Sequence, residues 1–144
     1  MHRLTALALF WVNMVRLTLP LILLPLLPAV GAAIRTDNLE PVVVSEVRTR
    51  LAFLTAAEPD CSPQELVVRV IKQPANGKLE VEEGNGFGYA QKENIRAKCG
   101  EMPIWGKLIY YTSNADFKGS DTAVVEWFTD NGVARRYRFK IIVK

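Results

Sequence analysis

The chain has 144 residues, with 18 basic side chains, 15 acidic side chains and one histidine, His2. Because His2 lies in a hydrophobic N-terminal segment, we expect the folded domain to lack histidine, which excludes histidine-based nucleophilic and zinc sites. Arg3 and Arg16 lie in the same segment, so the remaining domain is almost neutral and shows no electrostatic preference for nucleic acid.

The N-terminal segment is typical of a secretory signal peptide. It carries positive charge, continues as an apolar stretch and ends in the small residues Gly31-Ala32-Ala33, which suit a signal peptidase. We therefore expect residues 1–33 to be a signal peptide. Residues 34–144 then form one domain, which we expect to be periplasmic or secreted.

Two alternatives for this segment stay open. Met14 begins a complete signal peptide by itself, which would make it the true start of the protein. A retained membrane anchor is the other alternative, because the apolar stretch after Arg16 has about the length of a spanning helix. Three prolines interrupt that stretch, and proline breaks helical hydrogen bonding, so we expect cleavage and no membrane contact afterwards.

The domain is predicted to consist of short β-strands without a helix. Apolar residues alternate with polar ones, or run together, over seven segments that turn residues separate. The predicted strands are residues 41–47, 49–54, 65–71, 78–82, 107–112, 122–129 and 133–143. This pattern is typical of an all-β fold, an immunoglobulin-like antiparallel β-sandwich of about seven strands.

The last two predicted strands show how burial selects a register. A two-residue turn between them would mix charged and apolar side chains on both faces of the hairpin. A three-residue loop over residues 130–132, with Gly132 in a left-handed conformation, places Glu126 opposite Arg136 instead. Because a one-residue slip inverts every side chain, we predict this second register.

Cys61 and Cys99 are the only cysteines of the chain. An even number of cysteines in a small exported domain predicts a disulfide bond. On the chain-entropy model, closing a loop of this length contributes about 4 kcal/mol to the free energy of unfolding. Two free thiols are the alternative, whereas metal binding by two cysteines without histidine is disfavoured.

Two motifs resemble those of bacterial immunoglobulin-like, cadherin-like repeat domains. Residues 73–79 (QPANGKL) resemble their QPxxG turn and following strand, and residues 111–121 (YTSNADFKGSD) resemble their YTPNADFxGTD signature. The resemblance covers roughly residues 66–144. It implies the same sandwich fold, here as a single copy, similar to short secreted bacterial proteins that carry one such domain with a cysteine pair.

Loop residues in and near these motifs are expected to have structural roles. Phe117 is expected to close one end of the sandwich, Gly119 to permit a tight bend, and Asp121 to accept backbone N–H bonds. The predicted structural loop residues are Pro74, Gly77, Phe117, Gly119, Asp121 and Gly132.

Calcium is an alternative ligand for the loop carboxylates. Asp116, Asp121 and Asp130 all lie in or beside predicted loops, and calcium prefers several loop oxygens. Their spacing lacks the calcium-loop pattern, however, and the cap and turn roles account for Asp121 and Asp130. We therefore predict no metal site and no cofactor.

The long segment over residues 83–106 is the strongest candidate for a functional surface. Long connections in compact domains are mostly functional or disordered, and this one carries the aromatic residues Phe87, Tyr89 and Trp105. Its glycine-rich start, residues 84–88, is interpreted as a flexible loop, since no helix follows as a phosphate-binding loop requires. Aromatic side chains on a disulfide-tied loop suit a binding surface; the alternative is that they cover an open edge of the sandwich.

Two classes of function follow. The first is a non-catalytic module with a structural role, or a role in binding an envelope protein or glycan, and we expect it to be a monomer. The second is an enzyme that uses a pair of carboxylates on an envelope polysaccharide, with candidates Glu80, Glu82 and Glu83. Glu80 and Glu82 alternate with apolar residues on an expected solvated strand face, so we predict the non-catalytic module, without catalytic residues.

Overall fold

The computed structural model describes residues 33–88 and 92–144. Apart from Ala33, the predicted signal peptide with Met14 lies outside the described residues, and so does Tyr89. Within these two ranges, no helix is both long enough and apolar enough to cross a membrane.

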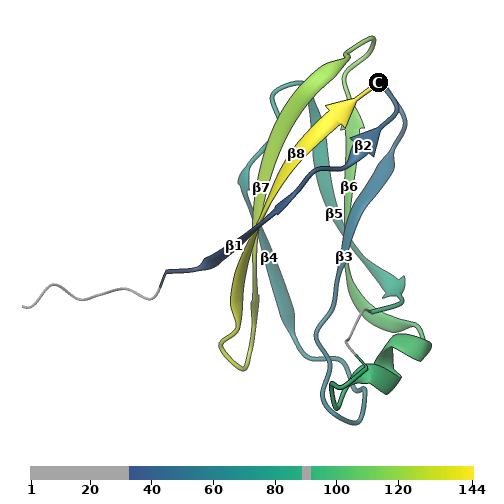
Figure 1. The fold of residues 1–144 in the computed structure, drawn as a ribbon, viewed down its shortest axis with the longest axis vertical. Helices are drawn as coiled ribbons and strands as arrows, with labels where there is room; N and C mark the ends of the chain where they lie inside the picture. Colours follow the sequence, from purple (N-terminus) through teal and green to yellow (C-terminus); the bar gives the residue numbers. More distant parts are fainter. Residues whose placement is uncertain (1–32, 89–91) are drawn as a thin grey trace, which may run out of the picture. The chain divides into compact units, whose positions relative to one another are not determined.

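Eight strands and one short 3₁₀ helix make up the described part of the chain (Figure 1). The elements are β1 (Arg35–Leu39), β2 (Val42–Val43), β3 (Thr49–Leu54), β4 (Leu66–Lys72), β5 (Gly77–Gly86), η1 (Ala97–Glu101), β6 (Ile104–Ser113), β7 (Gly119–Thr129) and β8 (Ala134–Val143).

The strands form two packed sheets, which Figure 1 shows as two layers. One sheet has the order β1-β8-β7-β4, with β2 also paired to β8, and the other has the order β3-β6-β5. The pairs are antiparallel except that β1 and β2 run parallel to β8. The prediction of an all-β, immunoglobulin-like sandwich is therefore confirmed.

The inward-facing side chains of both sheets form one apolar core. Fully buried residues come from β6, β7 and β8, and Leu79 of β5 packs against them. The residues without exposed surface are Ile109, Tyr111, Ala123, Val125, Phe139 and Ile141. Within each of these strands the residues without exposed surface are two positions apart, which is the period of one face of a sheet.

The register of the β7–β8 hairpin is as predicted. Glu126 lies opposite Arg136, and Arg136 Nε donates to Glu126 Oε1 at 2.8 Å. Thr129 N–H donates to the carbonyl of Val133, which closes the loop, and Gly132 has a φ of 84°. Burial therefore selected the correct pairing.

The start of the domain differs from the predicted strand 41–47. Only Val42 and Val43 of that segment form a strand, because the chain turns at Glu46, whose φ is 61°. The Glu46 N–H donates to Ser113 Oγ at 2.8 Å, which ties this turn to the end of β6. The structure has an additional strand that was not predicted, β1, which pairs with β8. The backbone hydrogen bonds of this pair do not require apolar side chains to alternate with polar ones, so the sequence pattern did not indicate the strand.

The prediction of a flexible loop over residues 84–88 is wrong for residues 84–86, which belong to β5. Gly84 and Gly86 belong to β5, which pairs with the start of β6. A side chain at Gly86 would meet the Phe53 ring at 3.0 Å, and one at Gly106 would overlap both that ring and the carbonyl of Leu54. The glycines therefore let Phe53 lie flat across the outer face of the sheet.

Candidate functional site

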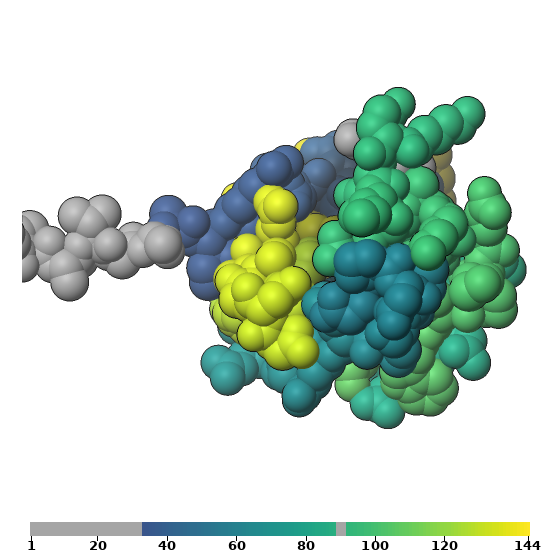
Figure 2. Space-filling view, turned by 90° about the horizontal axis from the view of Figure 1, so that it is seen from below, coloured from purple at the N-terminus to yellow at the C-terminus, as the bar shows by residue number. Residues whose placement is uncertain are grey.

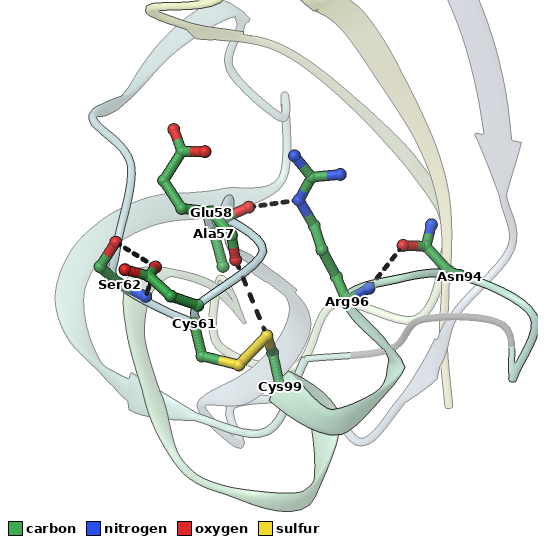
Figure 3. Close-up of a disulfide and its surroundings, with 8 residues drawn as sticks. Ala57, Glu58, Cys61, Ser62, Asn94, Arg96 and Cys99 are labelled. Atoms are coloured by element: carbon green, nitrogen blue, oxygen red, sulfur yellow. Dashed lines mark hydrogen bonds between the residues drawn. A yellow bond between two sulfur atoms is a disulfide. The ribbon is translucent and has the colours of Figure 1, made fainter.

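A disulfide holds one end of the sandwich together. Cys61, in the connection between β3 and β4, is bonded to Cys99 of η1, with Cα atoms 5.2 Å apart (Figure 3). Both cysteines of the chain are used, so the predicted bridge is confirmed. It joins two connections that no strand pairing links.

Arg96 provides a second tie beside the disulfide. Its Nε donates to the carbonyl of Ala57 at 2.6 Å, and its backbone N–H donates to Asn94 Oδ1 at 2.8 Å. Figure 3 shows the guanidinium turned away from the two sulfur atoms. The helix η1 and the residue before it, Arg96, are thus held to the β3–β4 connection by one disulfide bond and one hydrogen bond.

The predicted binding residues lie in this region and are exposed where they are described. Phe87 is 67% exposed just after β5, and Trp105 is 47% exposed near the start of β6, paired with Asn85. Trp105 therefore stands on a strand and not on the predicted long loop. Two exposed aliphatic residues of the same segment, Ile95 at 69% and Met102 at 50%, were missed because only aromatic residues were considered.

Trp105 borders a hollow between the edges of the two sheets. The hollow has a volume of about 490 Å³ and lies between β4 and the β5–β6 pair. Leu66, Val68 and Val81 give it apolar walls, while Lys107 and Glu83 form an ion pair at its margin. Apolar walls with a few polar groups are typical of binding sites for small molecules.

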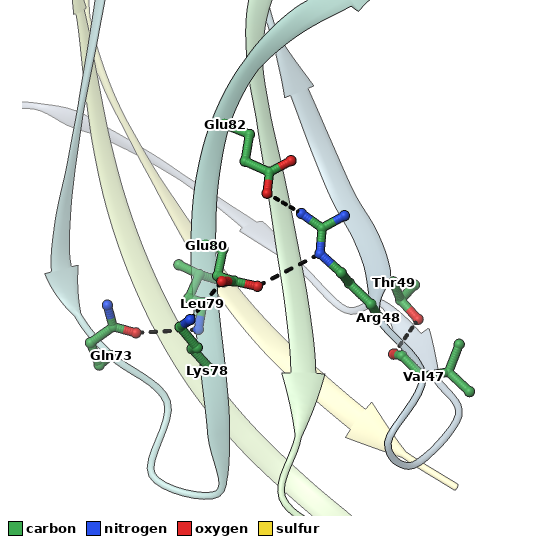
Figure 4. A network of polar contacts seen from close by, with 8 residues as sticks. All are labelled: Val47, Arg48, Thr49, Gln73, Lys78, Leu79, Glu80 and Glu82. Carbon is green, nitrogen blue, oxygen red and sulfur yellow. Dashed lines mark hydrogen bonds and ion pairs between the residues drawn. The ribbon is translucent and has the colours of Figure 1, made fainter.

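Arg48 holds the candidate carboxylates Glu80 and Glu82 together on one face of the sheet, whereas Glu83 lies on the other face. Adjacent residues of a strand point to opposite faces, so Glu82 lies on the outer face with Arg48, at 2.6 Å, and Glu83 pairs with Lys107 instead. Figure 4 shows Arg48 reaching both Glu82 and Glu80.

The environment of Glu80 favours its ionised form. The hydrogen bond from Lys78 lowers the pKa of this carboxyl, although partial burial opposes the shift. A general acid needs the opposite, a pKa raised toward the working pH. Arg48, which also binds Glu80, lies over the Tyr110 ring at 3.5 Å from its centroid, so the cluster is a surface network of charges around an aromatic ring.

The two sequence motifs meet at the opposite end of the sandwich, around Asp121. Its carboxylate accepts the backbone N–H of Ala75 at 2.9 Å and of Asn76 at 2.8 Å, both from the first motif. It also accepts the N–H of Thr122 at 2.8 Å and the hydroxyl of Tyr111 at 3.2 Å. Asp121 is only 4% exposed, so these donors depend on it.

The other motif residues shape the same corner. Pro74 is buried, and a side chain at Gly77 would come within 2.5 Å of the Thr112 carbonyl. Phe117 packs against the core, and Gly119 has a φ of 136°. The sequence did not predict the role of the Tyr111 hydroxyl, because the alternating pattern of a strand indicates only that this tyrosine is buried.

Stability at high pH should depend on Tyr111. Burial, followed by the charge and hydrogen bond of Asp121, raises the pKa of its phenol to about 12, against about 10 in an unfolded chain. Because the fold favours the protonated phenol, the free energy of unfolding should be unaffected below pH ~10 and fall by about 2 kcal/mol as the pH rises to ~12. Urea unfolding of wild type and Tyr111→Phe at pH 9, 11 and 12 measures this.

The phenylalanine variant should be the less stable protein at pH 9 and should approach wild type at pH 12. Parallel losses in the two proteins over this range would contradict the role given to Tyr111.

The structure does not group Asp116, Asp121 and Asp130 as metal ligands. Within the described ranges, no cluster of three or more histidine, cysteine or acidic side chains could hold a metal ion. Asp121 is occupied by its donors, and the backbone N–H of Asp116 donates to Glu46 Oε1 at 3.2 Å.

No protein-family model matches the chain, and no curated protein is significantly similar to it. Its function therefore has to be argued from the geometry of the domain itself.

Proposed function

We propose that the domain is a non-catalytic, immunoglobulin-like binding module of the cell envelope, which binds a protein or a glycan through its disulfide end. The observation that carries this proposal is the exposure of four large apolar side chains within residues 87–105, on a segment that the Cys61–Cys99 bridge holds in place. We call Phe87, Ile95, Met102 and Trp105 the tethered surface.

Rigid attachment is what makes the tethered surface suitable for binding. Large apolar side chains bind tightly when they are ordered before the partner arrives, because less conformational entropy is lost. The disulfide and the Arg96–Ala57 hydrogen bond supply that order. The hollow beside Trp105 gives a partner a concave place to insert a side chain or a sugar ring.

The disulfide and the N-terminal segment support an envelope location. Disulfides persist in secreted and periplasmic proteins and are rare in the cytosol, and the N-terminal segment is typical of a signal peptide. The resemblance of the two motifs to bacterial immunoglobulin-like repeats supports the same assignment. Intact mass before and after reduction, measured on protein from fractionated cells, tests both the cleavage near Ala33 and the compartment.

Partner retention is expected to depend on the tethered surface. The immobilised protein is exposed to envelope extracts, either untreated or digested with protease, so that a protein partner and a glycan partner are distinguished. The double variant Phe87→Ala, Trp105→Ala should retain at least tenfold less of the partner than wild type does, because aromatic anchors dominate binding energy. Val42→Ala, Val44→Ala is the matched control, since both valines are also exposed but lie outside this segment.

Equal retention by the two double variants would contradict the proposed surface. The enzyme alternative is tested in parallel with Glu82→Gln and Glu83→Gln. Release of sugar from envelope polysaccharide by wild type, lost in either glutamine variant, would replace the binding module with a carboxylate-based enzyme.

A further inference from the structure

A second hollow opens at the disulfide end, on the other side of the β3–β4 connection. It has a volume of about 580 Å³. Residues 55–57 and Gln64 of the connection form one wall, Asn94 and Arg96 a second, and the ends of β7 and β8 a third. Figure 2 looks onto this end, where the connection, the segment before η1 and the β7–β8 turn lie next to one another.

The hollow has positively charged walls. Arg96 and Arg135 line it, and no carboxylate does. In the described part of the chain neither arginine forms an ion pair. Arg135 lies next to Arg35 in the β1–β8 pairing, and Asp37 is already paired with Arg35 at 3.2 Å. Two arginines without counter-charges favour an anionic ligand.

The terminal nitrogens of Arg96 remain available. Its Nε is the one side-chain nitrogen that donates a hydrogen bond to a described residue, the carbonyl of Ala57. That bond fixes the plane of the guanidinium and leaves both terminal nitrogens for a ligand. A guanidinium held in this way matches the two oxygens of a carboxylate.

Trp127 adds an aromatic ring to the same walls. Its Nε1 is the buried side-chain polar atom that lacks a hydrogen-bond partner among the described residues, and such orphaned donors are rare in folded proteins. Burial, and then the charge of Asp37, raise the pKa of the neighbouring Tyr137. The charge of Arg135, and after it the indole N–H of Trp127, oppose this shift. Because the indole nitrogen has almost no exposed surface, it is the other atoms of the Trp127 ring that line the hollow.

The remaining lining groups match hydroxyls better than a phosphate. Thr129 and Asn131 are hydrogen-bonded to each other and to the N–H of Val133. The donor and acceptor positions that these bonds leave over, together with the amide N–H groups of Asn94, can meet sugar hydroxyls. The hollow has neither the glycine-rich loop nor the helix N-terminus with which proteins commonly surround phosphate. The indole of Trp127 offers an apolar wall against which the C–H face of a sugar ring can pack.

We propose that this hollow binds a carboxylate-bearing sugar unit of an acidic polysaccharide, with Arg96 and Arg135 on the carboxylate and Trp127 beside the ring. Its volume lies within the ~300–1,000 Å³ of small-ligand sites. This inference goes beyond the proposed function, because none of its residues belongs to the tethered surface.

The test is a titration of the ¹⁵N-labelled protein with trigalacturonate, followed by the indole N–H resonance of Trp127. The probes for comparison are neutral galactotriose and inorganic phosphate. Saturable shifts with trigalacturonate, at an affinity at least tenfold higher than for either comparison probe, are expected. Equal binding of phosphate, or no saturable shift at millimolar trigalacturonate, would overturn the proposal.

Matched arginine variants separate a site from general charge attraction. Arg135→Gln should weaken trigalacturonate binding at least tenfold, whereas Arg138→Gln, an exposed arginine of the same strand, should leave it unchanged. Equal weakening by both variants would overturn the site. The Phe87→Ala, Trp105→Ala protein should still bind trigalacturonate, so failure of the tethered surface and failure of this hollow are distinguished.

Discussion

Replacing Asp121 with alanine is expected to lower the free energy of unfolding by about 4 kcal/mol. Its carboxylate is the acceptor for the backbone N–H groups of Ala75 and Asn76 and for the hydroxyl of Tyr111. A buried donor left without its acceptor costs about 1–3 kcal/mol, and the variant leaves one buried donor and two partly buried donors at one corner. Urea unfolding at pH 7, followed by tryptophan fluorescence, measures the loss.

Two variants test whether the loss of stability comes from the hydrogen bonds of Asp121 and not from the removal of any aspartate. Asp121→Asn keeps one acceptor oxygen and should recover part of the stability. Asp130→Ala removes an exposed aspartate of the β7–β8 turn and should change the free energy of unfolding by less than ~1 kcal/mol. A loss below ~1 kcal/mol for Asp121→Ala would mean that solvent replaces the carboxylate, and that this corner does not hold the two motifs together.

Removing the disulfide should be almost as costly. The double variant Cys61→Ala, Cys99→Ala opens a loop with a sequence separation of 38 residues. The entropy that the unfolded chain regains corresponds to about 4 kcal/mol on the chain-entropy model. Small domains are stable by only about 5–15 kcal/mol, so the variant should unfold at markedly lower urea concentration.

Chemical reduction provides the matched control for this variant. A reductant should destabilise wild type to about the level of the double variant and leave the double variant unchanged. Amide exchange in residues 92–103 should also be faster in reduced wild type and in the double variant than in oxidised wild type, because η1 then retains fewer contacts with the β3–β4 connection. Unchanged unfolding after complete reduction would contradict the stabilising role of the bridge.

Local patterns were sufficient where side-chain alternation and turn chemistry agree. The β7–β8 hairpin could be predicted to the residue, because only one register buries Val125 and Phe139 while it pairs Glu126 with Arg136. The disulfide could be predicted from the number of cysteines and the expected compartment. Both predictions rest on constraints that act within short segments or on a single pair.

Strand boundaries could not be predicted where backbone pairing, and not side-chain pattern, decides them. β1 has a mixed polar sequence and is a strand because β8 offers it hydrogen-bonding partners. The sequence predicts a loop at Gly84 and Gly86, yet both belong to β5. Side chains from other strands, Leu108 at Gly84 and Phe53 at Gly86, occupy the space that a Cβ atom would fill. The side chain that requires each glycine lies far away in the sequence, so the residues around the glycine do not reveal it.

The sequence by itself determined the fold class, the hairpin register and the cysteine pair, because alternation, turn residues and residue counts are local properties of the chain. Only the tertiary structure brought Asp121 to the first motif. It also brought Arg96 next to Arg135 and Trp127 around one hollow. In both cases the partners are far apart in the chain, and they meet because two sheets pack face to face and the connections between strands converge at the two ends of the sandwich.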